Sequence, residues 1–337
     1  MDRPIVALIL AGGTGTRLYP ASRAARPKQF QSFDEDQSLL AETVERASFA
    51  EETYVLTREA FADEIHDHAP DAAVLTEPAP KDTGPALVYG AHRIREQVGE
   101  CVLLVLPSDH VVGAGFRPVA ERAARVAVET GGLVTMGVEP TRAETGYGYI
   151  EPGEARESAS GAGYETVASF HEKPDEATAS EYVDRGYYWN AGMFAWTPAA
   201  LLSAARNAPL AGLVEALDEG DPEAGFDAVE GVSIDYAVLE RADDVAVVPA
   251  DFEWDDLGAW DALARHLSTD ADGNAVRGES VTVDASDNVV ATDGHVSLVG
   301  VSNLVVASYD DRTLVVPVAE AQRVREVVAQ LREDGDF

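Results

Sequence analysis

The chain opens on IVALILAGGTGTRL, residues 5–18, in which an apolar run passes straight into a glycine-rich loop. The run from Ile5 to Ala11 is too short to cross a bilayer and predicts a first β-strand. Glycines directly after a strand allow backbone N–H groups to approach an anion closely. The spacing is neither that of a Walker A loop nor G-x-G-x-x-G, and a plain tight turn would use the same glycines. The opening therefore predicts an α/β protein whose first loop is a candidate phosphate site.

Outward from this stretch, short apolar runs alternate with helix-like segments over the first half of the chain. We expect strands at Ile5–Leu10, Thr53–Thr57, Ala73–Thr76, Val102–Leu106 and Leu133–Val138, and helices at Leu39–Ala47, Pro85–Gln97 and Phe116–Thr130. The apolar runs are continuous rather than alternating, which is typical of strands covered on both faces. This pattern predicts an α/β fold with a doubly wound, mostly parallel sheet.

The pattern loosens later and changes near the C-terminus. Tyr164–His171 and Met193–Trp196 are predicted strands, Glu176–Arg185 is a predicted helix, and Ile234–Glu240 is a short helix capped by Ser233. After a polar linker, short valine-rich strands follow without helices between them, at Ser280–Val283, Asn288–Ala291, Val296–Val299, Leu304–Ala307 and Thr313–Val316. An amphipathic helix from Ala319 to Leu331 ends the pattern. We expect one domain over residues 1–268 and a small β-helix-like domain over residues 269–337.

The charge of the chain is unusual, because 60 Asp and Glu residues face 25 Lys and Arg, a formal net charge of −35. Such a surface repels nucleic acid and anionic lipid, so we exclude both as partners. The acids are spread along the chain, which favours adaptation to high salt, although an ordinary, unusually acidic protein is the alternative. No further apolar run approaches membrane-spanning length, and the single Cys101 excludes an internal disulfide. We therefore expect a protein of a halophile's cytoplasm.

Lysine is nearly eliminated from the chain, since only Lys28, Lys81 and Lys173 accompany the arginines. Lys28 follows the glycine-rich loop and Arg17 in the sequence Pro-Lys-Gln-Phe. Its retention indicates that a compact point charge is needed there, with chance retention as the alternative. The loop thus gains two cations, which strengthens the prediction of a phosphate site.

The segment GGTGTRLYPASRAARPKQF, residues 12–30, resembles the opening motif of the mannose-1-phosphate guanylyltransferases within the sugar nucleotidyltransferase superfamily. Further matching motifs follow in the family's order across nearly the whole chain: DTGPA at 82–86, PSDH at 107–110, ETGYGYI at 144–150, FHEKP at 170–174, WNAGMF at 189–194, SIDY at 233–236 and WDDLGAW at 254–260. The resemblance implies the Rossmann-like fold of nucleotide-diphospho-sugar transferases. PKQF and WNAGMF point to the mannose and guanosine branch. Asp82 departs from the family's usual Asn, which leaves its role toward the nucleotide open, and the lack of a following cupin domain implies the monofunctional form.

Two aspartates are candidate ligands of Mg²⁺. Asp109 follows a predicted parallel strand, at the strand end where ligands bind in open α/β sheets, although a helix-capping role fits equally well. The resemblance implies that Asp256, rather than Asp255, is the second metal ligand, with Asp255 left as a supporting or solvated charge. The residues implied to be catalytic are Arg17, Lys28, Asp109 and Asp256.

The resemblance also implies two sets of substrate-binding residues. The nucleotide-binding set is Leu10, Ala11, Gly12, Gly13, Thr14, Gly15, Thr16, Arg17, Lys28, Thr83, Gly84, Pro85 and Ser108. The set for the sugar phosphate is Gly146, Glu172, Lys173, Asn190 and Gly192, in which Lys173 suits the phosphate and Glu172 the sugar hydroxyls.

The function implied is transfer of GMP from GTP to mannose 1-phosphate, giving GDP-mannose and pyrophosphate. One alternative is a glucose-1-phosphate thymidylyl- or uridylyltransferase, whose motifs are shared. Another is a non-catalytic subunit that senses a nucleotide sugar, but such relatives tend to lose catalytic Arg, Lys or Asp positions, which this chain keeps. The resemblance also implies a homodimer that pairs through the C-terminal β unit.

Overall fold

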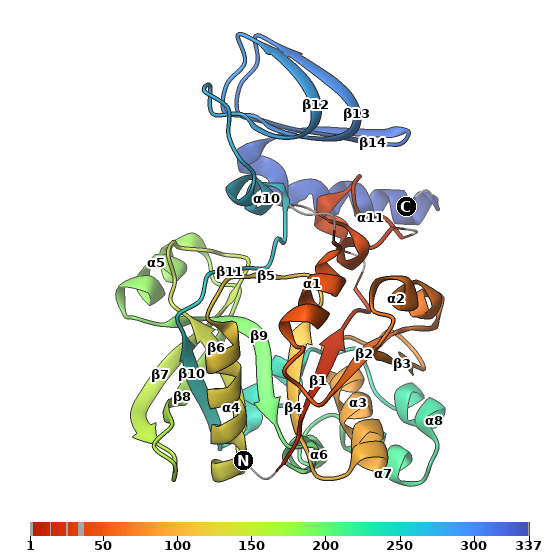
Figure 1. Ribbon diagram of the computed structural model, residues 1–337, viewed down its shortest axis with the longest axis vertical. Coiled ribbons are helices and arrows are strands. Elements are labelled where there is room, and N and C mark those ends of the chain that lie inside the picture. Colours follow the sequence, from red (N-terminus) through yellow and green to blue (C-terminus); the bar gives the residue numbers. More distant parts are fainter. Residues whose placement is uncertain (1–2, 14, 25, 33–36, 336) are drawn as a thin grey trace. The chain divides into compact units, whose positions relative to one another are not determined.

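A computed structural model describes residues 3–13, 15–24, 26–32, 37–335 and 337 (Figure 1). The chain divides into two compact units. Unit 1 comprises Met1–Gly12, Thr43–Ser108 and Val112–Trp254, and unit 2 comprises Gly13–Glu42, Asp109–Val111 and Asp255–Phe337. Unit 2 therefore combines most of the glycine-rich loop with the C-terminal segment.

Unit 1 contains, among its described residues, a nine-stranded sheet in the order β3-β2-β1-β4-β9-β6-β10-β8-β7. One half of the sheet is parallel, since β1 pairs with β2 and β4, and β2 pairs with β3. The five strands predicted in the first half of the chain are confirmed, with shifts of one residue at some ends. The strands are β1 (Ile5–Leu10), β2 (Glu52–Arg58), β3 (Ala73–Glu77), β4 (Val102–Pro107), β6 (Leu133–Val138), β7 (Gly148–Glu157), β8 (Gly163–Glu172), β9 (Tyr188–Trp196) and β10 (Val245–Ala250).

The other half of the sheet corrects the prediction of a mostly parallel, doubly wound sheet. Strand β9 lies antiparallel between β4 and β6, β8 is antiparallel to β10, and β7 is antiparallel to both β8 and β9. Within the described part of the nine-stranded sheet, five antiparallel pairings thus stand against four parallel ones, the fourth being that of β6 with β10. The pairing of β7 with β8 follows from their short connection, because five residues suffice for a hairpin but not for a helical crossover. The fold is a mixed α/β fold.

Helices cover the sheet of unit 1 (Figure 1). Helix α4 packs against β4, β6, β9 and β10, whereas α3 packs with α6, α7 and α9. Val6 and Leu8 of β1 belong to the core that contains α3, while Ala7 and Ile9 on the opposite face are equally buried. The helices of unit 1 are α2 (Ala62–His68), α3 (Thr83–Val98), α4 (Phe116–Thr130), α5 (Glu176–Asp184), α6 (Pro198–Arg206), α7 (Ala211–Asp218), α8 (Pro222–Asp227) and α9 (Ile234–Ala237), and α1 (Leu39–Arg46) begins in unit 2 and ends in unit 1.

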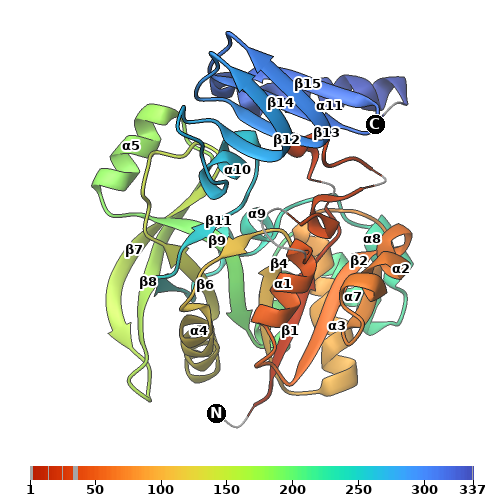
Figure 2. The ribbon, with the colours of Figure 1, turned by 45° about the horizontal axis from the view of Figure 1, so that its top comes forward.

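Unit 2 contains a β-helix-like stack, as predicted. Strands β12 (Ala275–Val283), β13 (Val289–Val299) and β14 (Leu304–Tyr309) run parallel, with a register shift between Arg277 and Glu279 of β12, and β15 (Arg312–Pro317) returns antiparallel to β14 (Figure 2). The two strands predicted at Asn288–Ala291 and Val296–Val299 form one long strand, β13. Buried Asn274 and Asn288 join successive layers, because the Nδ2 of Asn288 donates to the Oδ1 of Asn274 at 2.9 Å.

The glycine-rich segment packs on the rest of unit 2. Leu18 and Leu39 share a core with Trp260 of α10 (Trp260–His266), with β13 and β14, and with Val324 of α11 (Val324–Asp334). The Nε1 of Trp260 donates to the Tyr19 carbonyl at 3.0 Å.

Short elements complete the chain: the 3-10 helices η1 (Thr16–Leu18), η2 (Lys28–Phe30), η3 (Glu59–Phe61), η4 (Leu239–Arg241) and η5 (Val318–Arg323), and a separate two-stranded sheet of β5 (Val111–Val112) and β11 (Trp254–Asp255).

The sequence predicted no membrane-spanning segment and no disulfide within the chain. Within the described ranges, every helix is too short or too polar to span a bilayer. Cys101 is buried, and burial raises the pKa of its thiol to about 11.

Candidate functional site

The carboxyl end of β1 holds the first predicted nucleotide-binding residues in unit 1. The Ala11 N–H donates to the Leu56 carbonyl at 2.8 Å, and the Ala11 carbonyl accepts from the Thr57 hydroxyl at 3.0 Å. The Leu10 carbonyl accepts the N–H of Ser108 at 3.1 Å. Leu10, Ala11 and Ser108 therefore lie together at the strand ends where open α/β sheets bind ligands.

Glu77, at the end of β3, is a neighbour of this loop that sequence reasoning missed. A side chain on Gly12 would lie 3.2 Å from the Oε1 of Glu77. Burial raises the pKa of Glu77 to about 7, although the charge of Arg58 lowers it. Among so many acids no motif singled out Glu77, and its one signal was its place just after a predicted parallel strand.

The loop continues in unit 2, where Gly15 allows Lys28 to approach it. Gly15 has a φ of 62°, and a Cβ on it would lie 2.4 Å from the Cβ of Lys28. The glycine therefore has a packing role beside the expected anion-binding one. The other predicted residues of this loop are Gly13, which is exposed, Thr14, which lies outside the described residues, and Thr16, which begins η1.

Lys28 is the centre of a charged cluster in unit 2. Its Nζ donates to the Oδ2 of Asp109 at 3.0 Å and to the carbonyl of Asp256 at 2.6 Å. Only 2% of the surface of Lys28 is exposed. The Nη2 of Arg17 lies 3.6 Å from the Oδ2 of Asp256. The four residues expected to be catalytic, far apart in the sequence, are thus in contact around one buried ammonium; we call them the Lys28 cluster.

The electrostatics of the cluster keep Asp109 ionised. Burial alone would raise the pKa of Asp109, but the ammonium of Lys28, with His110 and Arg17, holds it below its usual range. Asp109 therefore remains a charged oxygen donor at neutral pH.

The turn that carries Asp256 requires glycine at position 258. The Gly258 N–H donates to the Oδ1 of Asp256 at 2.8 Å. A Cβ on Gly258 would lie 2.6 Å from the Oδ2 of Asp256 and 2.8 Å from the Nη2 of Arg17. The ion pair of Arg17 and Asp256 is thus packed directly over a residue that has no side chain.

Asp255, whose role the sequence left open, is a buried structural charge. Its Oδ2 accepts from the Nη2 of Arg265 at 2.7 Å and from the Nε at 3.1 Å. Burial would raise the pKa of Asp255, but its hydrogen bonds bring the pKa far below the usual range. Its Oδ1 accepts the N–H of Leu257 at 2.9 Å, which helps to shape the turn beside Asp256.

The Lys28 cluster has a donor set that fits Mg²⁺. Asp109 and Asp256 provide hard carboxylate oxygens, and Mg²⁺ is usually held by one or two carboxylates together with substrate phosphates and water. Across the described residues, no group of three or more His, Cys, Asp or Glu side chains forms a metal cage of its own. Two carboxylates suit a metal that completes its coordination with substrate phosphate oxygens and water.

The segment from Asp82 to Pro85 is tied into the fold of unit 1. Asp82 caps α3, its carboxylate accepting the Thr83 N–H at 2.7 Å. The Thr83 hydroxyl accepts the Ile234 N–H at 2.9 Å, and a Cβ on Gly84 would lie 2.6 Å from the Val232 carbonyl. The predicted nucleotide-binding residues Thr83, Gly84 and Pro85 thus begin a helix that anchors the segment before Asp235.

A shallow depression of unit 1, without free volume for a ligand in this structure, is lined in part by two of the residues predicted for the sugar phosphate, Glu172 and Asn190. It is lined by Gly148, Tyr149, Phe170, His171, Glu172, Asn190, Asp235 and Glu240, and we call it the β8–β9 pocket. Lys173, next to it on the chain, has a φ of 46° and its ammonium contacts the carboxylate of Glu172. The Lys173 side chain is 61% exposed, so the charge is open to an anionic ligand.

Two further residues predicted for the sugar phosphate flank this pocket in the chain. The Gly146 N–H donates to the Oε1 of Glu144 at 3.0 Å. Gly192 has a φ of 66°, and its N–H donates to the Oδ1 of Asn190 at 3.2 Å. Asp235, which the sequence singled out only as part of a matching motif, accepts from the Nδ2 of Asn190 at 2.7 Å.

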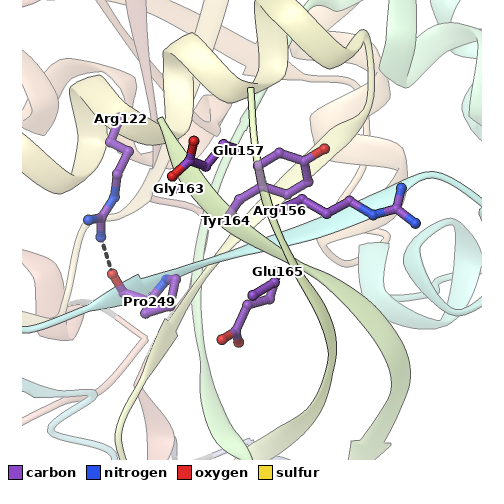
Figure 3. A pocket seen from close by; sticks show the side chains of 8 residues that line it. Arg122, Arg156, Glu157, Gly163, Tyr164, Glu165 and Pro249 are labelled. Carbon is purple, nitrogen blue, oxygen red and sulfur yellow. Dashed lines mark hydrogen bonds between the residues drawn. The ribbon is translucent and has the colours of Figure 1, made fainter. Parts of the chain in front are cut away.

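A larger cavity of about 690 Å³ lies elsewhere in unit 1 and contains none of the predicted site residues. Its lining includes Arg122, Arg156, Tyr164 and Glu165 (Figure 3). Arg122 turns to the carbonyl of Pro249, while Arg156 points away from it. The two guanidinium groups therefore do not converge on one point (Figure 3).

Comparison with known proteins places this geometry in a class. Residues 6–273 match the family model of the nucleotidyl transferases, and residues 278–331 match the mannose-phosphate isomerase/GMP-like β-helix domain. A mannose-1-phosphate guanylyltransferase of Escherichia coli is 34% identical, with 98% of this chain and 74% of the relative covered, and the xanthan biosynthesis protein XanB of Xanthomonas campestris is 36% identical over the same shares. A crystal structure from Thermus thermophilus, described as a mannose-1-phosphate geranyltransferase, has a TM-score of 0.89 at 39% identity, covering 98% of this chain and 99% of its own. The chain belongs to the mannose-1-phosphate guanylyltransferase family.

Proposed function

We propose that the protein transfers GMP from GTP to mannose 1-phosphate, forming GDP-mannose and pyrophosphate. The observation that carries this proposal is the Lys28 cluster, in which a buried ammonium joins Asp109 and Asp256 beside Arg17. Membership of the guanylyltransferase family supports the choice of both substrates.

The reaction is an in-line displacement at the α-phosphorus of GTP. A phosphate oxygen of mannose 1-phosphate forms the new P–O bond, while the bond from the α-phosphorus to the bridging oxygen breaks and pyrophosphate leaves. Because the nucleophile is already an anion, no general base has to remove a proton. The obstacle is the repulsion between two polyanions, which positioning and fixed charges reduce.

In unit 2, Arg17 and Lys28 supply the positive charge for the triphosphate. Lys28 is held by two oxygens and buried, so its ammonium is already in place when the nucleotide binds. Asp109 and Asp256 would hold Mg²⁺, which when bound neutralises phosphate charge. The N–H groups of residues 12–16 of the loop would bind phosphate oxygens.

In unit 1, Lys173 would bind the phosphate of the sugar substrate and Glu172 a sugar hydroxyl. Asn190, fixed by hydrogen bonds on both sides of its carboxamide, would bind a second hydroxyl. Gly146 and Gly192 would allow the backbone to lie close to the sugar. The fixed carboxamide of Asn190 and the exposed ammonium of Lys173 beside Glu172 support these roles.

Glu77 offers a reason for guanine to be preferred. Guanine presents two neighbouring donors, N1–H and the 2-amino group, which match the two oxygens of one carboxylate. Thymine and uracil present a single N3–H between two carbonyls. A carboxylate beside Gly12, at the end of β3, therefore favours GTP over the dTTP or UTP of the glucose-1-phosphate alternative.

The alternative of a non-catalytic sensing subunit is disfavoured by the same cluster. A sensor needs to bind a nucleotide sugar but has no use for a preorganised ammonium and two carboxylates at the triphosphate. Arg17, Lys28, Asp109 and Asp256 are all present and in contact.

The setting proposed is a salt-rich cytoplasm, and the proposed assembly is a homodimer formed through the C-terminal β unit. The charge of −35 supports the first. The exposed Val281, Val283, Val299 and Val315 of the β12–β15 sheet support the second. We retain residues 1–268 and 269–337 as the proposed domains, and the two family models meet between residues 273 and 278.

The deciding experiment is a substrate matrix at molar KCl with Mg²⁺, in which GTP, dTTP, UTP and ATP are each combined with mannose 1-phosphate and glucose 1-phosphate. We expect pyrophosphate release to be fastest for GTP with mannose 1-phosphate by at least about tenfold. Turnover of dTTP or UTP with glucose 1-phosphate at the higher rate would overturn the proposal.

A further inference from the structure

Asn190 of the β8–β9 pocket has one defined orientation. Its Oδ1 accepts the Gly192 N–H at 3.2 Å and the Thr135 hydroxyl at 3.1 Å. A backbone N–H can only donate, so the oxygen of the carboxamide must face Gly192. The nitrogen then faces Asp235, whose Oδ1 accepts from it at 2.7 Å.

Asp235 is the acceptor that makes this orientation favourable. A carboxylate accepts hydrogen bonds only, so it would repel the oxygen of a flipped carboxamide. Hydrogen bonds to a charged acceptor are shorter and stronger than neutral ones, in keeping with the 2.7 Å distance. Asp235 uses one of the two N–H groups of the Asn190 nitrogen.

The position of Asp235 is itself fixed by the start of α3. The N–H of Ile234, one residue earlier, donates to the Thr83 hydroxyl at 2.9 Å, and the N–H of Gly84 donates to the Val232 carbonyl at 2.9 Å. Two bonds within three residues leave the segment before Asp235 little freedom. The DTGPA motif and the SIDY motif, far apart in sequence, thus meet to hold one carboxylate.

The surroundings of Asp235 show that it is kept despite an electrostatic penalty. Burial and the charge of Glu172 together raise its pKa to about 6, although the hydrogen bond from Asn190 and the charge of Lys173 lower it. Glu240 also lines the pocket, and burial and Glu172 raise its pKa as well. A residue needed only for packing would not be an acid in this place.

We propose that Asp235 is a positioning residue for the sugar phosphate, which acts by holding the Asn190 carboxamide with its free N–H toward a sugar hydroxyl. The inference rests on the proposed function and assigns a role to a residue that touches no substrate itself.

The test uses the full-length protein and steady-state kinetics in molar KCl. Asp235→Ala removes the acceptor, and we expect the KM for the sugar phosphate to rise about tenfold, with the KM for GTP changed less than about twofold. Asp235→Asn keeps an acceptor oxygen, and we expect it to stay within about threefold of wild type. Asp227→Ala, on the exposed surface of α8, is the matched control.

A double-mutant cycle separates positioning from general damage. If Asp235 acts through Asn190, then Asp235→Ala adds little to the KM of Asn190→Ala, because the group that it positions is already absent. Independent, multiplicative effects would overturn the proposal, as would an equal rise of the KM for GTP or an Asp235→Asn variant as impaired as Asp235→Ala.

A wrong role for Asp235 and a wrong sugar substrate give different results in this experiment. Both mannose 1-phosphate and glucose 1-phosphate are assayed, and the KM is measured for whichever is turned over. Preference for glucose 1-phosphate would refute the mannose assignment while the Asp235 comparison is still read on the active sugar.

Discussion

Replacing Lys28 by Met tests the charge at the centre of the Lys28 cluster. Methionine keeps an unbranched stem of similar length in a site where Lys28 is almost fully buried, so little cavity is formed. It removes one hydrogen bond to the Oδ2 of Asp109 and one to the carbonyl of Asp256. Hydrogen bonds to charged groups contribute about 1.5–3 kcal/mol each. The Asp109 side chain is 35% exposed, so water replaces part of what is lost. We expect the free energy of unfolding to fall by about 2–3 kcal/mol.

The expected loss of activity is larger than the loss of stability would explain. Removal of one preorganised group that stabilises charge in the transition state lowers kcat by about 10²–10³-fold. Without the ammonium, Asp109 also loses the main influence that lowers its pKa, so it is protonated more readily. The loss of activity should therefore be greater at acidic pH.

Lys81→Met is the matched control for this experiment. The Nζ of Lys81 donates to the carbonyls of Phe226 and Val229 at 2.6 and 2.9 Å, without a carboxylate. We expect it to lose about 1–3 kcal/mol of stability while kcat stays within about threefold of wild type. Urea unfolding in molar KCl gives the free energies, and coupled pyrophosphate release gives kcat. A folded Lys28→Met protein with kcat within about threefold of wild type would refute the reasoning.

Three further predictions concern other parts of the chain. Gly258→Ala places a Cβ 2.6 Å from the Oδ2 of Asp256, so kcat should fall about tenfold or more; a wild-type rate of pyrophosphate release would contradict this. Glu77→Gln should stabilise the protein by about 1–2 kcal/mol at pH 8 and by almost nothing near pH 4, measured by urea unfolding. The raised pKa of Glu77, about 7, means that its contribution to stability is complete below pH 4.5 and is lost as the pH rises through 7. A larger stabilisation by Glu77→Gln at pH 4 than at pH 8 would contradict this prediction. Val283→Asp, beside the exposed Val299, should halve the mass seen by light scattering in high salt, and an unchanged mass would disprove the pairing surface.

The parallel half of the fold could be predicted from the sequence because its strands are buried on both faces. In β1 every residue but the last is buried, so the whole run is apolar and stands out. Strand β7 was missed since its outer half, including Glu154, Arg156 and Glu157, is exposed and charged like a loop. The antiparallel pairing of β7, β8 and β9 was missed with it, because it depends on which strands meet across a hairpin rather than on any local pattern.

The site was predictable as a set of residues but not as a set of contacts. Motifs indicated Arg17, Lys28, Asp109 and Asp256, yet nothing in their spacing showed that a single ammonium contacts both aspartates. Gly15 was interpreted as a turn that admits an anion, whereas the structure adds that it makes room for the stem of Lys28. Asp235 could not be assigned a role, since its significance comes from the orientation of Asn190, which depends on a backbone N–H two residues further along.

The surroundings of the retained lysines show where an ammonium suits the structure better than a guanidinium. Lys28 and Lys81 both place their ammonium on a backbone carbonyl at 2.6 Å, in confined positions. An ammonium can direct its three donors to separate oxygens around one point, whereas the planar guanidinium of arginine is wider and suits paired acceptors, as Arg265 does on Asp255. Retention of Lys28 and of Lys81 therefore indicates a confined oxygen cage and not catalysis as such, whereas Lys173 is exposed. What distinguishes Lys28 from Lys81 is the carboxylate of Asp109 in the cage, because this carboxylate is also a candidate ligand for the metal of a polyphosphate.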